Sequence, residues 1–277
     1  MPFLDKQKLN SMRNYIFTIL FLLAANRVLS QSGFKSNDLS DFPAQIKYAG
    51  TYDGHLQGIT TDYQSSLYWS HTTQLVKTDL KGNIIKVVDV PSHHGDLEYY
   101  DGKIYVAVNL GLFNEESGLS DSWVYIYNAK NLAFIKKYPV PEILYGAGGI
   151  AIFNTKVMIV GGLPDSGKYS KNQVYEYNLD FELQKIHFLE SGYTYKGIQI
   201  ATYYNGSWYF GCYGNAGKSL KPVVLKTMLV DNTLHLTKIY DLDFSYGMIG
   251  ISGNKWLVSN KTFDKMAKVV EFNECSF

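Results

Sequence analysis

Three patterns in this 277-residue sequence predict an all-β fold made of repeated four-stranded units. A glycine that opens an apolar strand recurs five times, at intervals of 37 to 54 residues. A second apolar or aromatic strand follows each glycine, and a third strand with some alternation of apolar and polar residues follows the second. The chain is also rich in Tyr, Trp, Phe and Gly, which suits short strands joined by tight turns. Together these patterns predict a five-bladed β-propeller of four-stranded antiparallel blades.

The expected elements follow one order in every unit. The innermost strands open at Gly58, Gly95, Gly149, Gly197 and Gly247. The second strands are expected at 67–70, 104–109, 157–161, 208–212 and 256–260. The third strands are expected at 74–78, 123–127, 173–177, 223–226 and 268–272.

The fourth strands indicate how the ring closes. Four units continue into a fourth strand, at 84–90, 133–138, 184–188 and 234–240. The fifth unit ends without one, and a strand-like segment at 45–49 precedes the first unit. We therefore expect this N-terminal strand to close the ring, which leaves only short protected edges. The alternative, an all-β sandwich with long loops, would not predict five copies of one strand order.

The first 30 residues have the pattern of a secretory signal peptide. Basic residues precede an apolar run at 15–25, and Val28-Leu29-Ser30 suits cleavage by a peptidase. The run is short for a membrane span, although an N-terminal membrane helix is the alternative. Met12 could be the true start instead of Met1, because Met-Arg-Asn before the apolar run already makes a complete signal.

The domain organisation follows from this reading. We expect a signal peptide at 1–30, a polar leader at 31–43 and a single propeller domain at 44–277. The protein would then be secreted or periplasmic, with no membrane attachment after cleavage. Cys212 and Cys275 are the only cysteines. They could form a disulfide in an exported protein or remain two buried thiols.

The charge of the chain limits its partners. Removing residues 1–30 takes away four positive charges and one negative charge, which changes the formal net charge from +1 to −2. The remaining chain contains no arginine, the fork-shaped donor on which nucleic-acid and polyanion sites usually rely. We therefore expect no nucleic-acid partner, and we expect a monomer.

Candidate functional residues gather at one predicted face of the ring. The innermost strands begin at this face, called the mouth, and the long loops at 110–122, 162–172 and 213–222 return to it. Four of the six histidines, together with acidic, amide and tyrosine side chains, fall there. We assign candidate catalytic roles to His94 and Asp96, and candidate ligand-binding roles to His55, Gln57, His71, His93, Tyr145, Tyr195, Gln199 and Tyr246.

These residue types allow several chemistries. Imidazoles and carboxylates can move protons or hold a divalent metal, but no ligand spacing such as His-Glu-x-x-His accompanies them. Aromatic faces beside amides would suit a sugar, although Tyr is also a common strand residue. The run His93-His94-Gly95-Asp96 could instead be structural, as a turn in which Asp96 accepts backbone N–H bonds and one imidazole packs into the ring.

Two stretches resemble known propeller families. Leu67-Tyr68-Trp69-Ser70-His71, followed by Lys77-Thr78-Asp79-Leu80-Lys81-Gly82, resembles one YWTD-type repeat of lipoprotein-receptor ectodomains. Gln57-Gly58-Ile59 and Gly95-Asp96-Leu97 resemble the blade openings of plant and bacterial glutaminyl cyclotransferases, which are exported five-bladed propellers with an acidic residue at the ring mouth. Where that family has Gly-Glu-Gly-Leu, this chain has His94-Gly95-Asp96-Leu97. The second resemblance implies an acid role for Asp96.

Two functions therefore remain as hypotheses. The first is a binding propeller that holds a small polar or glycan ligand, with carbohydrate preferred, at the mouth. The second is an exported enzyme, either a metal-assisted hydrolase or lyase or a cyclotransferase, which uses the histidines and Asp96 of the first two blades. No cofactor is identified by sequence, and a divalent metal is the one that the residue types could hold.

Overall fold

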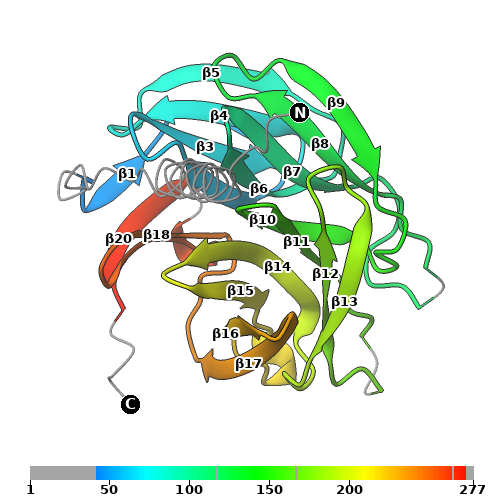
Figure 1. Ribbon diagram of the computed structural model, residues 1–277. Coiled ribbons are helices and arrows are strands. Elements are labelled where there is room, and N and C mark those ends of the chain that lie inside the picture. The colour runs from blue at the N-terminus through cyan, green and yellow to red at the C-terminus, as the bar shows by residue number, and fades with distance from the viewer. Residues whose placement is uncertain (1–41, 117, 166–167, 264, 273–277) are drawn as a thin grey trace, which may run out of the picture. The chain divides into compact units, whose positions relative to one another are not determined.

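The computed structural model describes residues 42–116, 118–165, 168–263 and 265–272. It confirms the predicted all-β fold, with five four-stranded antiparallel sheets arranged as the blades of a propeller (Figure 1). The signal peptide expected at 1–30, most of the leader expected at 31–43 and Cys275 lie outside the described residues. Among the described residues, no helix has the length and apolar character that a membrane crossing requires.

The strands occupy the predicted places. The innermost strands are β2 (Leu56–Thr61), β6 (His94–Tyr100), β10 (Ala147–Phe153), β14 (Tyr195–Tyr204) and β18 (Gly247–Ser252). The second strands are β3 (Ser66–His71), β7 (Lys103–Asn109), β11 (Lys156–Gly161), β15 (Ser207–Tyr213) and β19 (Lys255–Ser259). The third strands are β4 (Gln74–Asp79), β8 (Ser122–Asn128), β12 (Asn172–Tyr177), β16 (Val223–Val230) and β20 (Met266–Glu271).

The outermost strands complete the blades. They are β5 (Ile84–Asp89), β9 (Phe134–Pro139), β13 (Leu183–Leu189), β17 (Thr233–Tyr240) and β1 (Gln45–Lys47). Two short 3-10 helices, η2 (Ala216–Lys218) and η3 (Lys261–Phe263), lie in connections. Strand β1 pairs antiparallel with β20, with Ile46 opposite Ala267. The predicted closure of the ring by an N-terminal strand is therefore confirmed.

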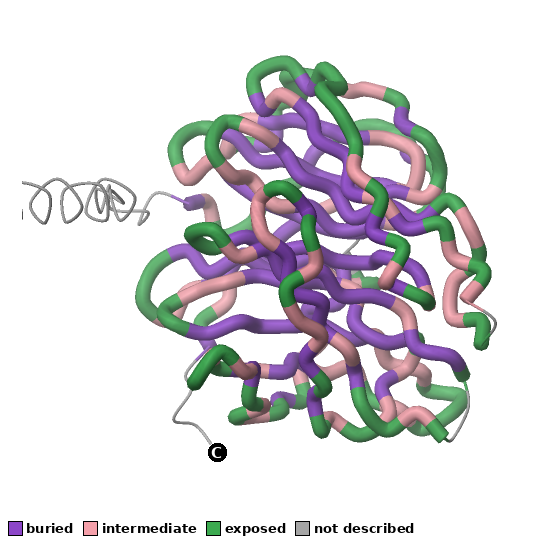
Figure 2. The backbone as a smooth tube through the Cα atoms, turned by 45° about the vertical axis from the view of Figure 1, so that its right-hand side comes forward, coloured by how far each residue is buried: buried purple, intermediate pink, exposed green. Residues whose placement is uncertain are grey.

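The core lies between neighbouring blades. Figure 2 shows the buried colour along the strands and the exposed colour at many of the connecting turns. Each interface between two neighbouring blades, here called a seam, is filled by apolar and aromatic side chains. Between the first two blades, for example, Tyr68 and Leu75 pack with Ile104 and Tyr127. Burying these side chains removes apolar surface from water, which is the dominant favourable contribution to folding.

Bulges redirect side chains in the first half of four innermost strands. A β-bulge breaks strand alternation and re-aims the extra residue. The register shifts leave Gln57 unpaired in β2, Gly95 and Asp96 in β6, Gly148 in β10 and Gln199 in β14. These positions therefore depart from the regular alternation of the strands.

The innermost strands approach one another too closely for side chains at some positions. A Cβ atom at Gly58 would come within 2.2 Å of Asp96 Oδ1 and 2.7 Å of Asp96 Cα. A Cβ atom at Gly95 would come within 2.4 Å of the Gly148 carbonyl oxygen. The glycines that open the innermost strands are therefore required by close packing around the axis.

Replacing Gly58 by alanine should destabilise the ring. The added methyl group has no space beside Asp96, so we expect Gly58→Ala to lower the free energy of unfolding by about 1–3 kcal/mol. The control is Gly217→Ala, because a Cβ atom there would meet only Asn215 Oδ1, at 3.3 Å. Equal unfolding midpoints for the two variants in urea would contradict this account of the axis.

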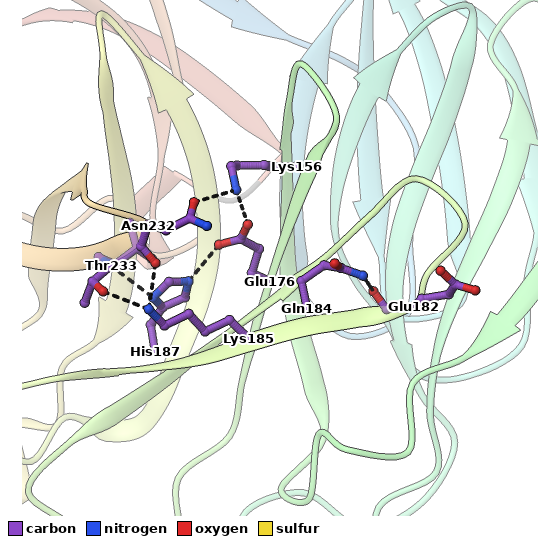
Figure 3. A network of polar contacts seen from close by, with 9 residues as sticks. Lys156, Glu176, Glu182, Gln184, Lys185, His187, Asn232 and Thr233 are labelled. Carbon is purple, nitrogen blue, oxygen red and sulfur yellow. Dashed lines mark hydrogen bonds and ion pairs between the residues drawn. The ribbon is translucent and has the colours of Figure 1, made fainter.

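The third blade holds a turn of the fourth blade through polar contacts (Figure 3). Lys185 Nζ donates to the Asn232 carbonyl oxygen and to Thr233 Oγ1, both at 2.7 Å. Lys156 Nζ pairs with Glu176 and lies 3.3 Å from Asn232 Oδ1. A cavity of about 270 Å³ beside these contacts is lined by Thr155, Lys156, Glu176, Tyr177, Asn178, Gln184, Lys185 and Asn232. This seam is therefore partly polar.

His187 lies inside this polar seam and is held as a neutral imidazole. Its side chain is fully buried. Nδ1 accepts the Leu234 backbone N–H at 3.1 Å, so the proton of the ring is on Nε2, which donates to Glu176 Oε2 at 2.9 Å. Burial lowers the pKa of His187, against the opposing effect of Glu176. A proton on Nδ1 would remove the acceptor for Leu234.

Acid should therefore weaken the seam between the third and fourth blades. Because the pKa of His187 is lower in the folded chain than its ordinary value of 6.5, the stability it contributes is present above that value. It is lost as the pH falls toward the folded pKa. His187→Gln keeps a neutral donor and acceptor, so its free energy of unfolding should fall less between pH 7 and pH 5. His235→Gln, on an exposed position of β17, should keep the wild-type pH dependence, and identical slopes for both variants would contradict the assignment.

Candidate functional site

Two histidines converge on one glutamine at the mouth. Gln57 lies in the bulge of β2 and is 5% exposed. Its Nε2 atom is 3.3 Å from His55 Nε2 and 3.2 Å from His93 Nε2. Thr72 Oγ1 is a third acceptor, at 3.3 Å. An amide nitrogen has two hydrogens, so these three acceptors compete for two hydrogen bonds.

The hydrogen bonds assign the protons of both rings. His55 Nδ1 lies 2.7 Å from the Leu56 carbonyl oxygen, which can only accept, so Nδ1 carries the proton and Nε2 accepts from Gln57. Burial, together with the neighbouring His55, lowers the pKa of His93 to about 4. His93 is therefore neutral at pH 7 and, like His55, accepts from Gln57 through Nε2.

Aromatic rings surround the two imidazoles. Tyr246 stacks on His55, with ring centroids 4.5 Å apart and an interplanar angle of 18°. Tyr213 stands edge-on to both His55 and Tyr246. Phe113, from the loop after β7, stands edge-on to His93 at 5.1 Å. We call the residues His55, Gln57, His93, Phe113, Tyr213 and Tyr246 the mouth cluster.

Asp96 lies at the axis and is 1% exposed. Its Oδ2 atom accepts the backbone N–H of Ala201, in the fourth blade, at 2.9 Å. Burial raises the pKa of Asp96 well above its ordinary value, and this outweighs the opposing effect of the backbone N–H groups of Ala201, Leu97 and Ile150. Burial therefore favours the uncharged form of the carboxyl, and the backbone contacts match the structural alternative considered for this run of the sequence.

The other two histidines turn away from the cluster. His71 is fully buried, with Nε2 2.6 Å from Tyr48 Oη and its ring stacked on Tyr52 at 4.5 Å. His94 is also fully buried, between the Pro91 carbonyl oxygen and Tyr127 Oη, each at 2.7 Å. Of the four histidines predicted on one face of the ring, two, His55 and His93, therefore share a partner. His93 and His94 are adjacent, and adjacent side chains on an extended chain point to opposite sides.

Three further candidates lie on the rim of the mouth. Tyr145 contacts Tyr169, with hydroxyl oxygens 3.5 Å apart, and this hydrogen bond raises the pKa of Tyr145 to about 12. The Tyr195 ring lies beside two lysines. Gln199 donates through Nε2 to the Lys196 carbonyl oxygen at 2.7 Å. Tyr145 precedes β10 of the third blade, and Tyr195 and Gln199 lie in β14 of the fourth.

The donor atoms bear on the metal and disulfide hypotheses. Within the described ranges, no three His, Cys, Asp or Glu side chains gather in a way that could hold a metal ion. Cys212 is buried, and burial raises the pKa of its thiol to about 12. Since Cys275 is outside the described residues, both alternatives for the two cysteines stand.

Sequence reasoning missed Phe113 and Thr72. Phe113 lies in the long loop at 110–122, which was expected at the mouth, and Thr72 follows β3 at the same end. Their positions in loops at the mouth end of the blades were the one feature of the sequence that could have indicated them. Which side chain of a loop turns toward the axis is set by contacts between blades, and sequence periodicity does not report those contacts.

Solved structures share this fold at low sequence identity. Myxococcus xanthus glutaminyl cyclase aligns with a TM-score of 0.58 and 12% identity, over 83% of this chain and 94% of that chain. The RRP9 WD40 repeats align with a TM-score of 0.47 and 7% identity, over 83% and 98%. No protein-family model and no curated protein matches the sequence. The five sheets establish the five-bladed β-propeller fold, and the similarity to the glutaminyl cyclase structure supports the fold alone.

Proposed function

We propose that the protein is an exported, monomeric propeller that binds a small polar ligand, preferably a carbohydrate, at the ring mouth. The observation that carries the proposal is the convergence of His55 and His93 on Gln57 within aromatic walls. Small-molecule sites typically combine a few convergent polar groups with apolar or aromatic surfaces. The mouth cluster has this composition.

The polar groups of the cluster favour a neutral ligand. His93 is uncharged at pH 7 because burial lowers its pKa to about 4, and burial raises the pKa of Asp96, which favours its uncharged form. A buried charge on the ligand would find no opposite charge among these groups and would lose its hydration. Sugar hydroxyls, which both donate and accept, can satisfy an imidazole or an amide without that cost.

Loss of a cluster amide should weaken binding without unfolding the protein. In a screen of glycans and small polar molecules by calorimetry, we expect Gln57→Ala to raise the Kd of the best ligand roughly 10- to 100-fold, because the partners of Gln57 are left unsatisfied. Gln184→Ala is the matched control, since Gln184 lines the distant polar seam and donates to Glu182.

The same screen can reject the proposal. A ligand whose Kd is equal for wild type and Gln57→Ala would not be bound at the mouth cluster. If no ligand in the screen loses affinity when His93 or Tyr246 is substituted, the proposed binding function would be rejected altogether. Melting temperatures of each variant separate lost binding from lost folding.

A second candidate is an enzyme that cyclises an N-terminal glutamine. It is favoured by opposite pKa shifts in two groups: burial lowers the pKa of His93 to about 4, and burial raises the pKa of Asp96 above its ordinary value. In this reaction the α-amino nitrogen attacks the γ-amide carbon, a ring C–N bond forms and ammonia leaves. The amine must lose a proton and the departing nitrogen must gain one, so a neutral base and a neutral acid suit it.

Asp96→Asn tests this second candidate. An asparagine can still accept the Ala201 N–H but cannot deliver a carboxyl proton, so ammonia release from a glutaminyl peptide should fall at least about 100-fold while the melting temperature stays close to wild type. Asp96→Ala should lower the melting temperature, because it leaves the Ala201 N–H unsatisfied. A wild-type protein that releases no ammonia would eliminate the enzyme and leave the binding proposal intact.

A further inference from the structure

Lys196 has an unusual backbone conformation for a strand residue. Its φ is 60°, and within the strands of the described residues it is the one non-glycine residue in the left-handed region. It lies in β14 where the register also shifts between Tyr195 and Ile198. A long side chain is disfavoured in this region, and such positions persist only where surrounding contacts impose them.

The contacts that impose this conformation come from two blades. The Lys196 carbonyl oxygen accepts Gln199 Nε2 at 2.7 Å. Gly197, the next residue, packs so closely on the third blade that a Cβ atom would come within 2.3 Å of the Gly161 carbonyl oxygen. The main chain is thus fixed at the edge of the mouth, and the Lys196 side chain is exposed there.

The charges around Lys196 leave its ammonium without a carboxylate partner. The two mouth loops at 162–172 and 213–222 contain four lysines, and each forms an ion pair. The pairs are Lys168–Glu116, Lys171–Glu190, Lys218–Asp165 and Lys221–Asp241. Lys196 lies between the two loops and forms no salt bridge with any described residue.

Asp165, an acidic side chain on which the charge of Lys196 acts, already has two partners. Asp165 pairs with Lys218 through Oδ2 and accepts the Tyr193 hydroxyl through Oδ1 at 3.0 Å. These two bonds, with a smaller effect from Lys196, lower the pKa of Asp165. An anion arriving from solvent would therefore meet the ammonium of Lys196 without displacing an existing pair.

An aromatic face lies beside this ammonium. The Tyr195 ring centroid is 5.5 Å from Lys196 Nζ and 5.8 Å from Lys218 Nζ. A sugar ring can pack on an aromatic face, while a carboxylate on that sugar reaches a lysine. After residue 30 the chain has no arginine, so lysine is the permanently charged group available to hold an anion.

We propose that Lys196 selects an acidic sugar, such as a uronic acid, by binding its carboxylate at the rim while the neutral hydroxyls occupy the mouth cluster. This inference rests on the proposed carbohydrate-binding function and adds the substrate class to it. The strained backbone places the ammonium at the rim, where the ion pairs of the neighbouring loops cannot neutralise it.

The test compares uronic acid disaccharides with their methyl esters, which keep the ring and remove the charge. We expect wild type to bind the acid about fivefold more tightly than the ester at low salt, with the preference shrinking as NaCl is raised. Lys196→Met should bind acid and ester equally and should keep the wild-type affinity for the ester. The matched control Lys171→Met, which removes a paired lysine on the same face, should keep the preference.

Lys196→Gly separates charge from backbone strain. Glycine adopts a φ of 60° without penalty, so this variant should melt at or above the wild-type temperature and still lose the preference for the acid. An unchanged preference in Lys196→Met or Lys196→Gly would overturn this inference but not the proposed carbohydrate function. Equal wild-type affinities for acid and ester would do the same. Failure of wild type to bind either sugar would instead overturn the proposed carbohydrate function, and the inference with it.

Discussion

The buried carboxyl of Asp96 is the group on which the centre of the ring depends. It extends from the second blade, faces backbone N–H groups of Ile150 in the third blade and Ala201 in the fourth, and lies against Gly58 of the first. Four blades therefore meet at one buried side chain. Backbone donors so close to the axis have no access to water, and an unsatisfied donor there would cost free energy. The Asp96 carboxyl accepts one of them, the Ala201 N–H, and burial favours its uncharged form, which avoids burying a charge.

The candidate site is a result of the same crowding. The register of the innermost strands shifts near their starts, so that some residues there lie outside the regular pairing. Gln57 is placed between two imidazoles in this way. Glycine takes the equivalent place in the third blade, as Gly148. The mouth is consequently asymmetric although the blades repeat, with its imidazoles at the first two blades and its ammonium groups at the third and fourth.

The fold was more accessible from sequence than the site. Strand order and ring closure follow from local periodicity and from an unpaired N-terminal segment. Both features can be recognised in the sequence without knowledge of long-range contacts. His55, Gln57 and His93, all named as candidates from the sequence, contact one another, since each lies at or just before the start of an innermost strand. His94 and His71 were not brought to the cluster, because the side of the strand that a residue faces depends on the bulges, and these arise from packing between blades. The importance of Lys196 was hidden for the same reason, since its φ is not encoded by a turn-forming residue.

Ring closure has a consequence for the order of events during synthesis. Strand β1 leaves the ribosome long before β20, yet the two pair, with Gln45 opposite Lys268. The first blade can therefore fold while its neighbour across the closure does not yet exist, and contacts between such distant segments form slowly. During that interval β1 is an unpaired strand that could pair wrongly with another chain. Its length of three residues, with Gln45 and Lys47 exposed, makes it a poor template for a wrong partner.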